Sequence, residues 1–505
     1  MNVNAKIATV KELWNWRLRQ SRQKVFVIEN DQQYSYGEMA KLVAAKIKLL
    51  KACRIGQGDL VALQFELDVE NVATILACIE LGAVINPLNP HLDITEVENL
   101  VERFQPCAII SQASVRGRDT ISNFKHLKHY QVEVNGDLKI FTRIKHGISP
   151  FTNKTGASAP VIVINTSGTS GLSKGVVLSN QNVLAAEIGY NVAFGINKHD
   201  MILLVSGLYH AIGFHHGLIS TMMAGSTMVL MKHYQVDEVA KLLLRLPITC
   251  IDSLPTIMYD LLFHVANIGQ LRMLICGGDK IKTSLLVQAK KRNIPLYNCY
   301  GLTEAVPFSY TPSNYFAEHQ AMTTAVTPIT GVKVRIVKKQ HVVEQKDVQG
   351  IIEVCGPVVF QGYLNNPEKT REAFDHGWLI TGDLGHYNSD GLFEIDGRNS
   401  DKIIRGGENI SAALVEEKIK SCQNIKEVAV LGVPDDRLGQ RIGAIIVLNH
   451  SQLALNKTKL LAELQEQQVD KKLWPEKILI VDSLPKTANG KVKKYLLRKL
   501  LEGKK

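Results

Sequence analysis

The sequence predicts a multidomain α/β protein. We expect a large N-terminal domain of helix-covered parallel sheets with a small antiparallel, barrel-like subdomain, followed by a small, mobile α+β C-terminal domain. The chain has 505 residues, too many for one ordinary core. Through about residue 395, short β-branched runs alternate with amphipathic stretches, as βαβ units do. From about residue 330, short strands with turn signals replace that pattern.

The expected strands of the parallel sheets are apolar runs such as 60–65, 161–164 and 248–251. Helical patterns lie between them, for example at 281–292, which ends just before Pro295. Strand–helix alternation of this kind indicates parallel sheets with helices on their faces. Segments 332–337 and 350–354 are the expected strands of the antiparallel subdomain.

The last hundred or so residues form a compact unit of their own. We expect helices at 414–421 and 457–468 and strands at 428–433 and 442–447. The polar stretch 396–401 is the expected boundary. It divides the chain into an N-terminal domain, 1–397, and a C-terminal domain, 398–505, with a hinge near 398–401.

The composition indicates a cytoplasmic globular protein, with 45% hydrophobic and 21% charged residues. The N-terminus lacks the apolar segment of a signal peptide. Segment 201–231 contains no Asp, Glu, Lys or Arg, but histidines, hydroxyl residues and glycines interrupt it. A buried strand plus helix therefore explains it better than a membrane span. The eight scattered cysteines show no metal-ligand spacing and are expected to be reduced and mostly buried.

The formal net charge of +11 indicates affinity for anions. Nucleic acid is the first candidate from charge alone, but no zinc-finger, RNP or basic-zipper pattern supports it. ATP, pyrophosphate and CoA are polyanions as well, and the motifs below favour them.

A glycine- and hydroxyl-rich loop follows the expected strand 161–164 and ends at Lys174-Gly175. Its glycines let backbone N–H groups turn toward an anion, its hydroxyls add donors, and Lys174 adds a positive charge. No Walker A pattern fits it. A loop of this composition is often a connection without a binding function, but the preceding strand and the closing lysine favour phosphate binding. The candidate residues are Thr166, Ser167, Gly168, Thr169, Ser170, Gly171 and Lys174.

This loop resembles the signature of the adenylate-forming superfamily, which comprises acyl- and aryl-CoA synthetases, peptide-synthetase adenylation domains and luciferases. Ser173 stands where that pattern commonly has a proline. Other motifs occur in the superfamily's order between residues 165 and 491. They are Gly277-Gly278-Asp279, Tyr300-Gly301-Leu302-Thr303-Glu304, Thr381-Gly382-Asp383, Arg398, Gly406-Gly407 and Asn489-Gly490-Lys491.

The resemblance implies a role for each motif. Glu304 and Thr169 would bind Mg²⁺, which a carboxylate beside phosphates requires. Asp383 would accept hydrogen bonds from the ribose, and Lys491 would stabilise the charge that builds up during adenylation. The other implied roles are Thr303 at the α-phosphate, Tyr300, Gly277, Gly278 and Asp279 near the adenine, Arg398 on the nucleotide, Gly407 along the CoA tunnel and Ser400 at the hinge.

Taken alone, several of these residues have simpler explanations. Glu304 could be an exposed residue after a turn, and Gly407 could be a turn glycine before a helix. Lys491 lies among other lysines, as residues of a solvated basic face do. Only their common order along the chain favours the functional interpretation.

The resemblance places an acyl pocket at His210 and Gly301. A single histidine in an apolar stretch is also often a core residue. His215 and His216 are adjacent, are expected to face different directions, and make a poor metal pair. Amino-acid-activating members of the superfamily carry an aspartate in this region, whereas 201–231 contains no acid, so the resemblance disfavours an amino-acid substrate. A fatty, aryl or dicarboxylic acid remains open.

These motifs predict an AMP-forming acid–CoA ligase that uses ATP, Mg²⁺ and CoA. The alternative is an adenylating enzyme that loads the phosphopantetheine of a carrier protein. A non-catalytic binding protein is disfavoured because the charged residues of every motif are present.

Overall fold

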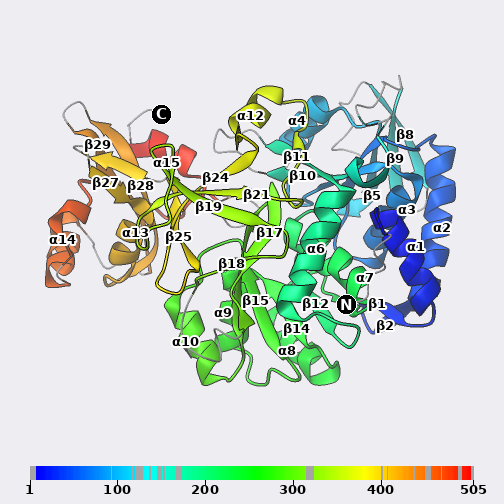
Figure 1. Ribbon diagram of the computed structural model, residues 1–505, viewed down its shortest axis with the longest axis horizontal. Coiled ribbons are helices and arrows are strands. Elements are labelled where there is room, and N and C mark those ends of the chain that lie inside the picture. The colour runs from blue at the N-terminus through cyan, green and yellow to red at the C-terminus, as the bar shows by residue number, and fades with distance from the viewer. Residues whose placement is uncertain are drawn as a thin grey trace.

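The computed structural model describes most of the chain and contains four main sheets (Figure 1). The described residues are 7–92, 94–115, 118–119, 129–135, 138–144, 151, 154–166, 173–313, 324–399, 402–405, 408–435, 438–449, 456–467, 469–486 and 492–501.

A nine-stranded sheet carries the strands that matter most for the site. Its order is β18 (Thr327–Pro328), β17 (Ala305–Tyr310), β16 (Leu296–Leu302), β15 (Met273–Gly277), β14 (Cys250–Ser253), β12 (Met201–Leu204), β13 (Thr227–Leu230), β1 (Val25–Glu29) and β2 (Gln32–Ser35). The strands from β16 to β1 in this order run parallel, and the edges are antiparallel. Parallel strands place their carboxyl ends at one edge, where ligands bind in such sheets.

An eight-stranded sheet holds the loop of 167–172 between two of its strands. Its order is β22 (Gly362–Tyr363), β11 (Lys174–Ser179), β10 (Pro160–Thr166), β4 (Val84–Leu88), β3 (Leu60–Gln64), β5 (Ala108–Gln112), β9 (Leu138–Arg143) and β8 (Tyr130–Asn135). A separate two-stranded ribbon pairs β6 (Ser114–Val115) with β7 (Arg118–Asp119).

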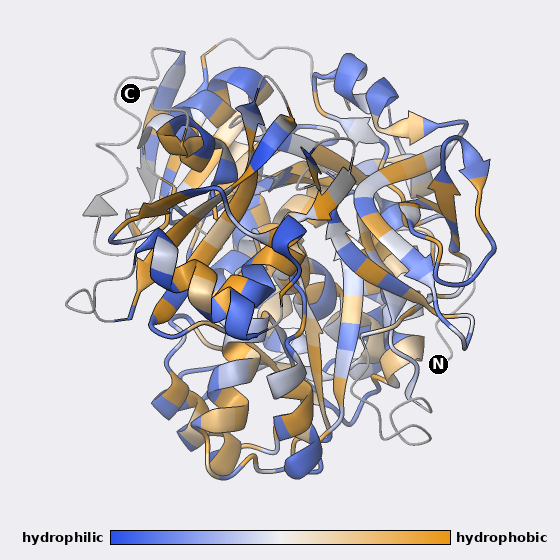
Figure 2. Cartoon of the chain, turned by 90° about the vertical axis from the view of Figure 1, so that its left-hand side faces the viewer, coloured by the Kyte–Doolittle hydropathy of each residue, from blue (hydrophilic) through white to orange (hydrophobic). Residues whose placement is uncertain are grey.

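Helices cover these sheets and fill the space between them. Val183 of one helix and Met222 of another share a core cluster with Ile162 of β10. Apolar residues line the strands of the interior, and hydrophilic residues lie on outward helix faces (Figure 2). The helices of this part are α1 (Val10–Ser21), α2 (Tyr36–Ala52), α3 (Val69–Leu81), α4 (Ile94–Phe104), η1 (Gly156–Ser158), α6 (Asn180–Phe194), α7 (Ser220–Ala224), α8 (Val236–Arg245), α9 (Pro255–Phe263), α10 (Thr283–Lys291) and α12 (Pro367–Glu372).

An antiparallel sheet follows. It contains β20 (His341–Val342), β19 (Lys333–Lys338), β21 (Gly350–Cys355), β24 (Trp378–Tyr387) and β23 (Phe374–Asp375), and β25 (Phe393–Arg398) pairs with β24.

The C-terminal sheet lies beside it in Figure 1 and has its own core around Ile403, Val415 and Ile442. Its elements are β26 (Lys402–Arg405), β27 (Glu408–Ser411), α13 (Ala412–Lys420), β28 (Ile425–Asp435), β29 (Gly439–Leu448), α14 (Lys457–Glu466), η4 (Lys471–Leu473), β30 (Lys477–Ile480) and α15 (Lys494–Leu501). The predicted fold class is confirmed.

The uncharged segment 201–231 forms β12, the π-helix η2 (Ile212–Ile219), α7 and β13. The expectation of a buried strand plus helix is confirmed, with a second strand added. Among the described residues, no helix is long and apolar enough to cross a membrane. All eight cysteines carry free thiols, and all except Cys355 are buried.

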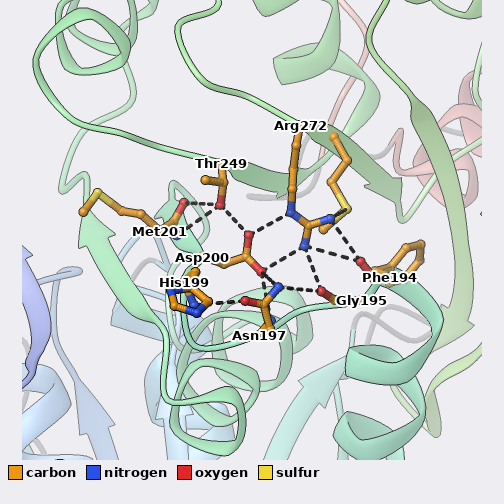
Figure 3. A network of polar contacts seen from close by, with 9 residues as sticks. Phe194, Gly195, Asn197, His199, Asp200, Met201, Thr249 and Arg272 are labelled. Carbon is orange, nitrogen blue, oxygen red and sulfur yellow. Dashed lines mark hydrogen bonds and ion pairs between the residues drawn. The ribbon is translucent and has the colours of Figure 1, made fainter. Parts of the chain in front are cut away.

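A polar network ties together the amino ends of three strands in the nine-stranded sheet (Figure 3). Asp200 precedes β12, Thr249 precedes β14 and Arg272 precedes β15. The Arg272 guanidinium donates to both Asp200 oxygens, at 2.8 and 2.9 Å, and Thr249 Oγ1 donates to the same carboxylate at 2.7 Å. Arg272 also donates to the Gly195 carbonyl at the end of α6. This network lies opposite to the carboxyl ends that carry the candidate site.

We expect Arg272→Met to lower the free energy of unfolding by about 2–4 kcal/mol, because it leaves the Asp200 carboxylate, 3% exposed, without its cation. Burial alone would raise the pKa of Asp200, but hydrogen bonds from Arg272 hold this pKa below its ordinary value. The pair therefore stabilises the fold above that ordinary value of about 4 and loses its effect as pH falls below it. Urea unfolding at neutral and acidic pH measures the difference.

The double variant Asp200→Asn/Arg272→Met is the control, because it removes the unpaired charge and should recover part of the loss. A difference between wild type and Arg272→Met that persists unchanged at pH below about 3 would contradict the ionic explanation.

Candidate active site

The glycine-rich segment at 277–279 lies where β15 ends, beside β16. Gly277 pairs with Cys299, so Gly278 follows next to Tyr300. Gly278 has a φ of +81°, and a Cβ there would lie 2.8 Å from Leu254 Cδ2. The backbone is thus held close to its neighbours, while Gly278 and Asp279 are exposed. This arrangement can present bare backbone to a flat ligand.

Tyr300, Asp383 and Arg398 form one network that joins three strands from two sheets. The Tyr300 hydroxyl donates to Asp383 Oδ2 at 2.6 Å, and Arg398 Nε lies 2.8 Å from Asp383 Oδ1. Arg398 is also the cross-strand partner of Asp383. Burial and the neighbouring Asp383 carboxylate raise the pKa of Tyr300 well above its ordinary value, so its hydroxyl keeps its proton. Both oxygens of a buried carboxylate are therefore fixed in place.

Thr303 and Glu304 form the tight turn between β16 and β17, since Leu302 pairs with Ala305. The turn fixes Glu304 in two ways. Its side chain accepts a hydrogen bond from Tyr363 Oη at 2.7 Å, and its carbonyl accepts one from the Phe360 N–H at 2.8 Å. A Cβ at Gly301 would lie 2.8 Å from the Ala305 carbonyl oxygen, so this tight turn needs a glycine there.

The ends of the predicted phosphate loop are held together by strands β10 and β11. Thr166 and Lys174 are cross-strand partners, and Ser173 Oγ donates to the Thr166 carbonyl at 2.9 Å. Lys174 Nζ lies 4.5 Å from the centre of the Tyr363 ring, whose hydroxyl binds Glu304. Burial and the Glu304 carboxylate raise the pKa of Tyr363. The mouth of the loop and the turn of Glu304 therefore meet through one tyrosine.

His210 lies between the end of β12 and η2, on the same side of the sheet as the other strand ends. It is partly buried, and its Nδ1 accepts a hydrogen bond from the Ile212 N–H at 3.3 Å. His215 and His216, six residues or fewer farther on, both contact Glu187, at 3.3 and 3.4 Å. The expectation that these two side chains face different directions is wrong, because both bind one carboxylate from within a π-helix.

Several predicted site residues lie outside the described residues. They are Ser167, Gly168, Thr169, Ser170, Gly171, Ser400, Gly407 and Lys491. The residues that flank Lys491 are partly described, since Lys486 and Val492 form an antiparallel bridge. Lys493 Nζ lies 3.9 Å from Glu96 Oε1 of α4. The same helix carries Arg103, which donates to the Ser173 carbonyl.

Sequence reasoning missed Tyr363. It lies 59 residues from Glu304 and far from Lys174, in a two-residue strand. A Gly-Tyr pair carries no pattern of its own. The pairing of β22 with β11 brings it to the site, and no local signal could have shown this.

The model of the AMP-binding enzyme family matches residues 14–364, and that of the AMP-binding enzyme C-terminal domain matches residues 414–491. The chain belongs to the AMP-binding enzyme family. The resemblance to adenylate-forming enzymes is thereby confirmed.

Relatives of this AMP-binding enzyme extend over nearly the whole chain. It is 29% identical to the medium-chain fatty-acid–CoA ligase of Escherichia coli, over 97% of this chain and 90% of the relative. It is 27% identical to the 2-succinylbenzoate–CoA ligase of Bacillus pumilus, over 96% and 97%. Its fold is similar to that of ATP-bound MatB from Rhodopseudomonas palustris, with a TM-score of 0.82, 24% identity and coverage of 98% and 100%.

The donor set of the AMP-binding enzyme fits ATP with Mg²⁺. Glu304 supplies a hard carboxylate oxygen, and Mg²⁺ prefers one or two such ligands together with phosphate oxygens. Among the described residues there is no group of three or more His, Cys, Asp or Glu side chains that could hold a metal by themselves. Asp383 can accept further hydrogen bonds on its second lone pairs, as ribose hydroxyls require.

We expect Asp383→Asn to raise the KM for ATP by about 10-fold or more, because an amide lacks the second acceptor oxygen and the charge that pairs with Arg398. The matched control is Asp396→Asn, an acid on β25 that pairs with His386 instead. Steady-state kinetics with varied ATP compare the two. Equal KM values for Asp383→Asn and wild type would exclude Asp383 from the nucleotide site.

Proposed function

We propose that the protein is an AMP-forming acid–CoA ligase that activates a carboxylic acid as an acyl-adenylate and then transfers the acyl group to CoA. The observation that supports this proposal is the convergence of the predicted nucleotide-binding residues at the carboxyl ends of the parallel strands. Asp383 accepts a hydrogen bond there from Tyr300, whose strand pairs with β15 as far as Gly277. Lys174 and Glu304 both contact Tyr363. The named relatives are acid–CoA ligases, which supports the reaction class.

In the first half-reaction a carboxylate oxygen of the acid attacks the α-phosphorus of ATP, and pyrophosphate leaves. Lys174 and the loop of Thr166 to Gly171 hold the phosphates, and Thr303 donates to the α-phosphate. Lys491 stabilises the negative charge on the pentavalent phosphorus, where such a charge is worth most. Glu304 and Thr169 would hold Mg²⁺, which would neutralise phosphate charge.

In the second half-reaction the CoA thiol, as its thiolate, attacks the acyl carbonyl, and AMP leaves. The thiol proton passes to solvent. Gly407 leaves room for the pantetheine arm, and His210 and Gly301 border the acyl group. Lys491 and the arm cannot occupy the α-phosphate region together, so the C-terminal domain, 398–505, rotates against 1–397 at Ser400. The contact between Lys493 Nζ and Glu96 Oε1, at 3.9 Å, brings the chain that follows the motif of Lys491 to α4 of the N-terminal domain, which supports a role for this motif at the nucleotide.

The thiol acceptor is CoA rather than a carrier protein. Both named relatives are CoA ligases, which supports this choice. A carrier protein is the alternative outcome of the experiment below. The cytoplasmic location stays a prediction.

A pyrophosphate-release screen across fatty, aryl and dicarboxylic acids, with and without CoA, tests the proposal. We expect release that requires ATP, Mg²⁺ and one class of acid, and turnover that continues only with CoA. Absence of release with every acid would contradict adenylation. A burst of release without CoA that CoA does not convert into turnover would favour a carrier protein.

Lys491→Ala is the matched variant for this screen. Its adenylation rate should fall by about 10²-fold or more, as for other groups that stabilise transition-state charge. Thioester formation from supplied acyl-adenylate should remain. Lys486→Ala, which loses a salt bridge to Glu427 close by, is the control and should keep both rates.

A further inference from the structure

A buried polar cluster lies between α6, η2 and β14, outside the nucleotide site. Its five residues are Glu187, Tyr190, His215, His216 and Asp252, and none is more than 4% exposed. Buried charges are costly unless they are paired, so a cluster of this kind requires an explanation.

Direct contacts join the five residues into one group. His215 Nδ1 and His216 Nδ1 lie 3.3 and 3.4 Å from Glu187 Oε1. The Tyr190 hydroxyl donates to Asp252 Oδ2 at 2.7 Å, and its ring stacks on that of His216 with 4.1 Å between centroids. Two carboxylates, two imidazoles and one phenol therefore lie within direct contact of one another.

The cluster is not internally satisfied. Asp252 Oδ1 and His215 Nε2 have no hydrogen-bond partner anywhere in the described part of the chain. Leaving such an atom buried without a partner destabilises the fold. Asp200, which directly precedes β12, has no such unpaired oxygen, because both of its carboxylate oxygens accept hydrogen bonds from Arg272. An unpaired buried acceptor requires an explanation, and a ligand that supplies the missing donor is one.

The cluster lies next to the predicted acyl pocket. Asp252 pairs with Ile275 in β15, two residues before Gly277. Burial and then the charge of Asp252 raise the pKa of the Cys299 thiol, and Cys299 directly precedes Tyr300 of the nucleotide site. The π-helix that carries His215 and His216 begins two residues after His210.

The charges of the cluster disfavour an anionic group. Burial alone would raise the pKa of Glu187. The charge of His216 and the contacts with both histidines outweigh burial and lower this pKa. Burial alone would lower the pKa of His216, but the Glu187 and Asp252 carboxylates raise it above its ordinary value. Burial lowers the pKa of His215, which stays neutral, and raises the pKa of Asp252 to about 6. At neutral pH two carboxylates thus face one imidazolium. A third carboxylate would be repelled, whereas a hydroxyl group can donate.

We propose, on the basis of the proposed ligase function, that this cluster is the far wall of the acyl subsite and selects carboxylic acids with a hydroxyl group remote from the carboxylate. Asp252 Oδ1 accepts the hydrogen bond from that hydroxyl. Plain fatty acids leave Asp252 unpaired, and dicarboxylic acids place a second negative charge beside it. A site built to bind a hydroxyl group rejects analogues that lack it more strongly than an apolar pocket does.

Matched acids test the proposal on the wild-type enzyme. Pyrophosphate release is measured for straight-chain acids of increasing length, each with its ω-hydroxy and ω-carboxy derivatives, and for phenylacetic acid with its para-hydroxy derivative. At the optimal length we expect kcat/KM for the hydroxy acid to exceed that for the plain acid by at least about 10-fold, and the dicarboxylic acid to be the poorest. A plain or dicarboxylic acid used as well as its hydroxy derivative at every length would overturn the proposal.

The double variant Tyr190→Phe/Asp252→Leu removes both partners of one hydrogen bond and so avoids leaving a new unpaired group. Its preference should shift by at least about 10-fold toward the plain acid. The Tyr234 hydroxyl, in the segment before α8, donates to Asp260 of α9 at 2.9 Å and forms a similar pair. Tyr234→Phe/Asp260→Leu is therefore the matched control with an unchanged preference. A preference that survives in the Asp252 variant overturns the proposal.

Thermal unfolding shows whether the double variant Tyr190→Phe/Asp252→Leu is folded. The comparison of matched acids on the wild-type enzyme does not depend on this variant. Failure of this inference is distinguishable from failure of the ligase proposal. Pyrophosphate release with plain acids but no hydroxyl preference overturns only the role of Asp252. No release with any acid overturns the reaction itself.

Discussion

The hydrogen bond between Tyr300 and Asp383 is the interaction on which the rest of the site depends. A buried carboxylate is costly, and the Tyr300 hydroxyl and the Arg398 guanidinium offset that cost with two short contacts. Tyr300 belongs to the nine-stranded sheet, whereas Asp383 and Arg398 belong to the antiparallel sheet. The bond therefore fixes the two sheets against each other where β15 ends in its glycines. On the proposed function, a ribose would bind where this carboxylate is held.

The two ends of the parallel strands serve different purposes. At the amino ends, both Asp200 oxygens accept hydrogen bonds from Arg272, and Thr249 donates to the same carboxylate (Figure 3). Arg272 also donates to the Gly195 carbonyl at the end of α6. Near the carboxyl ends, Asp252 Oδ1 has no hydrogen-bond partner among the described residues. The Glu304 carboxylate accepts a hydrogen bond from the Tyr363 hydroxyl. Satisfied groups stabilise the fold, whereas groups with remaining acceptor capacity can bind ligands.

Much of the fold and the positions of the motifs could be predicted from the sequence, because their signals are local. The alternation of strands and helices marked the parallel sheets, and the glycines of 277–278 and the turn of Thr303 and Glu304 were recognisable within a few residues. Tyr363 and the cluster around Asp252 could not be predicted. Glu187 and Asp252 lie far apart in the sequence, and only the packing of α6 on the sheet brings them together. The π-helix directs His215 and His216 to one carboxylate, which no regular helix period would have indicated.

Transfer of oxygen from the acid to AMP is the chemical consequence that most directly distinguishes adenylation from other routes to a thioester. If a carboxylate oxygen attacks the α-phosphorus, that oxygen stays with AMP when the thiol displaces it. With an acid labelled by oxygen-18 in its carboxylate, mass spectrometry of the products after one turnover should find one labelled oxygen in AMP and none in pyrophosphate. Unlabelled AMP, or label in phosphate or pyrophosphate, would contradict attack at the α-phosphorus and with it the acyl-adenylate.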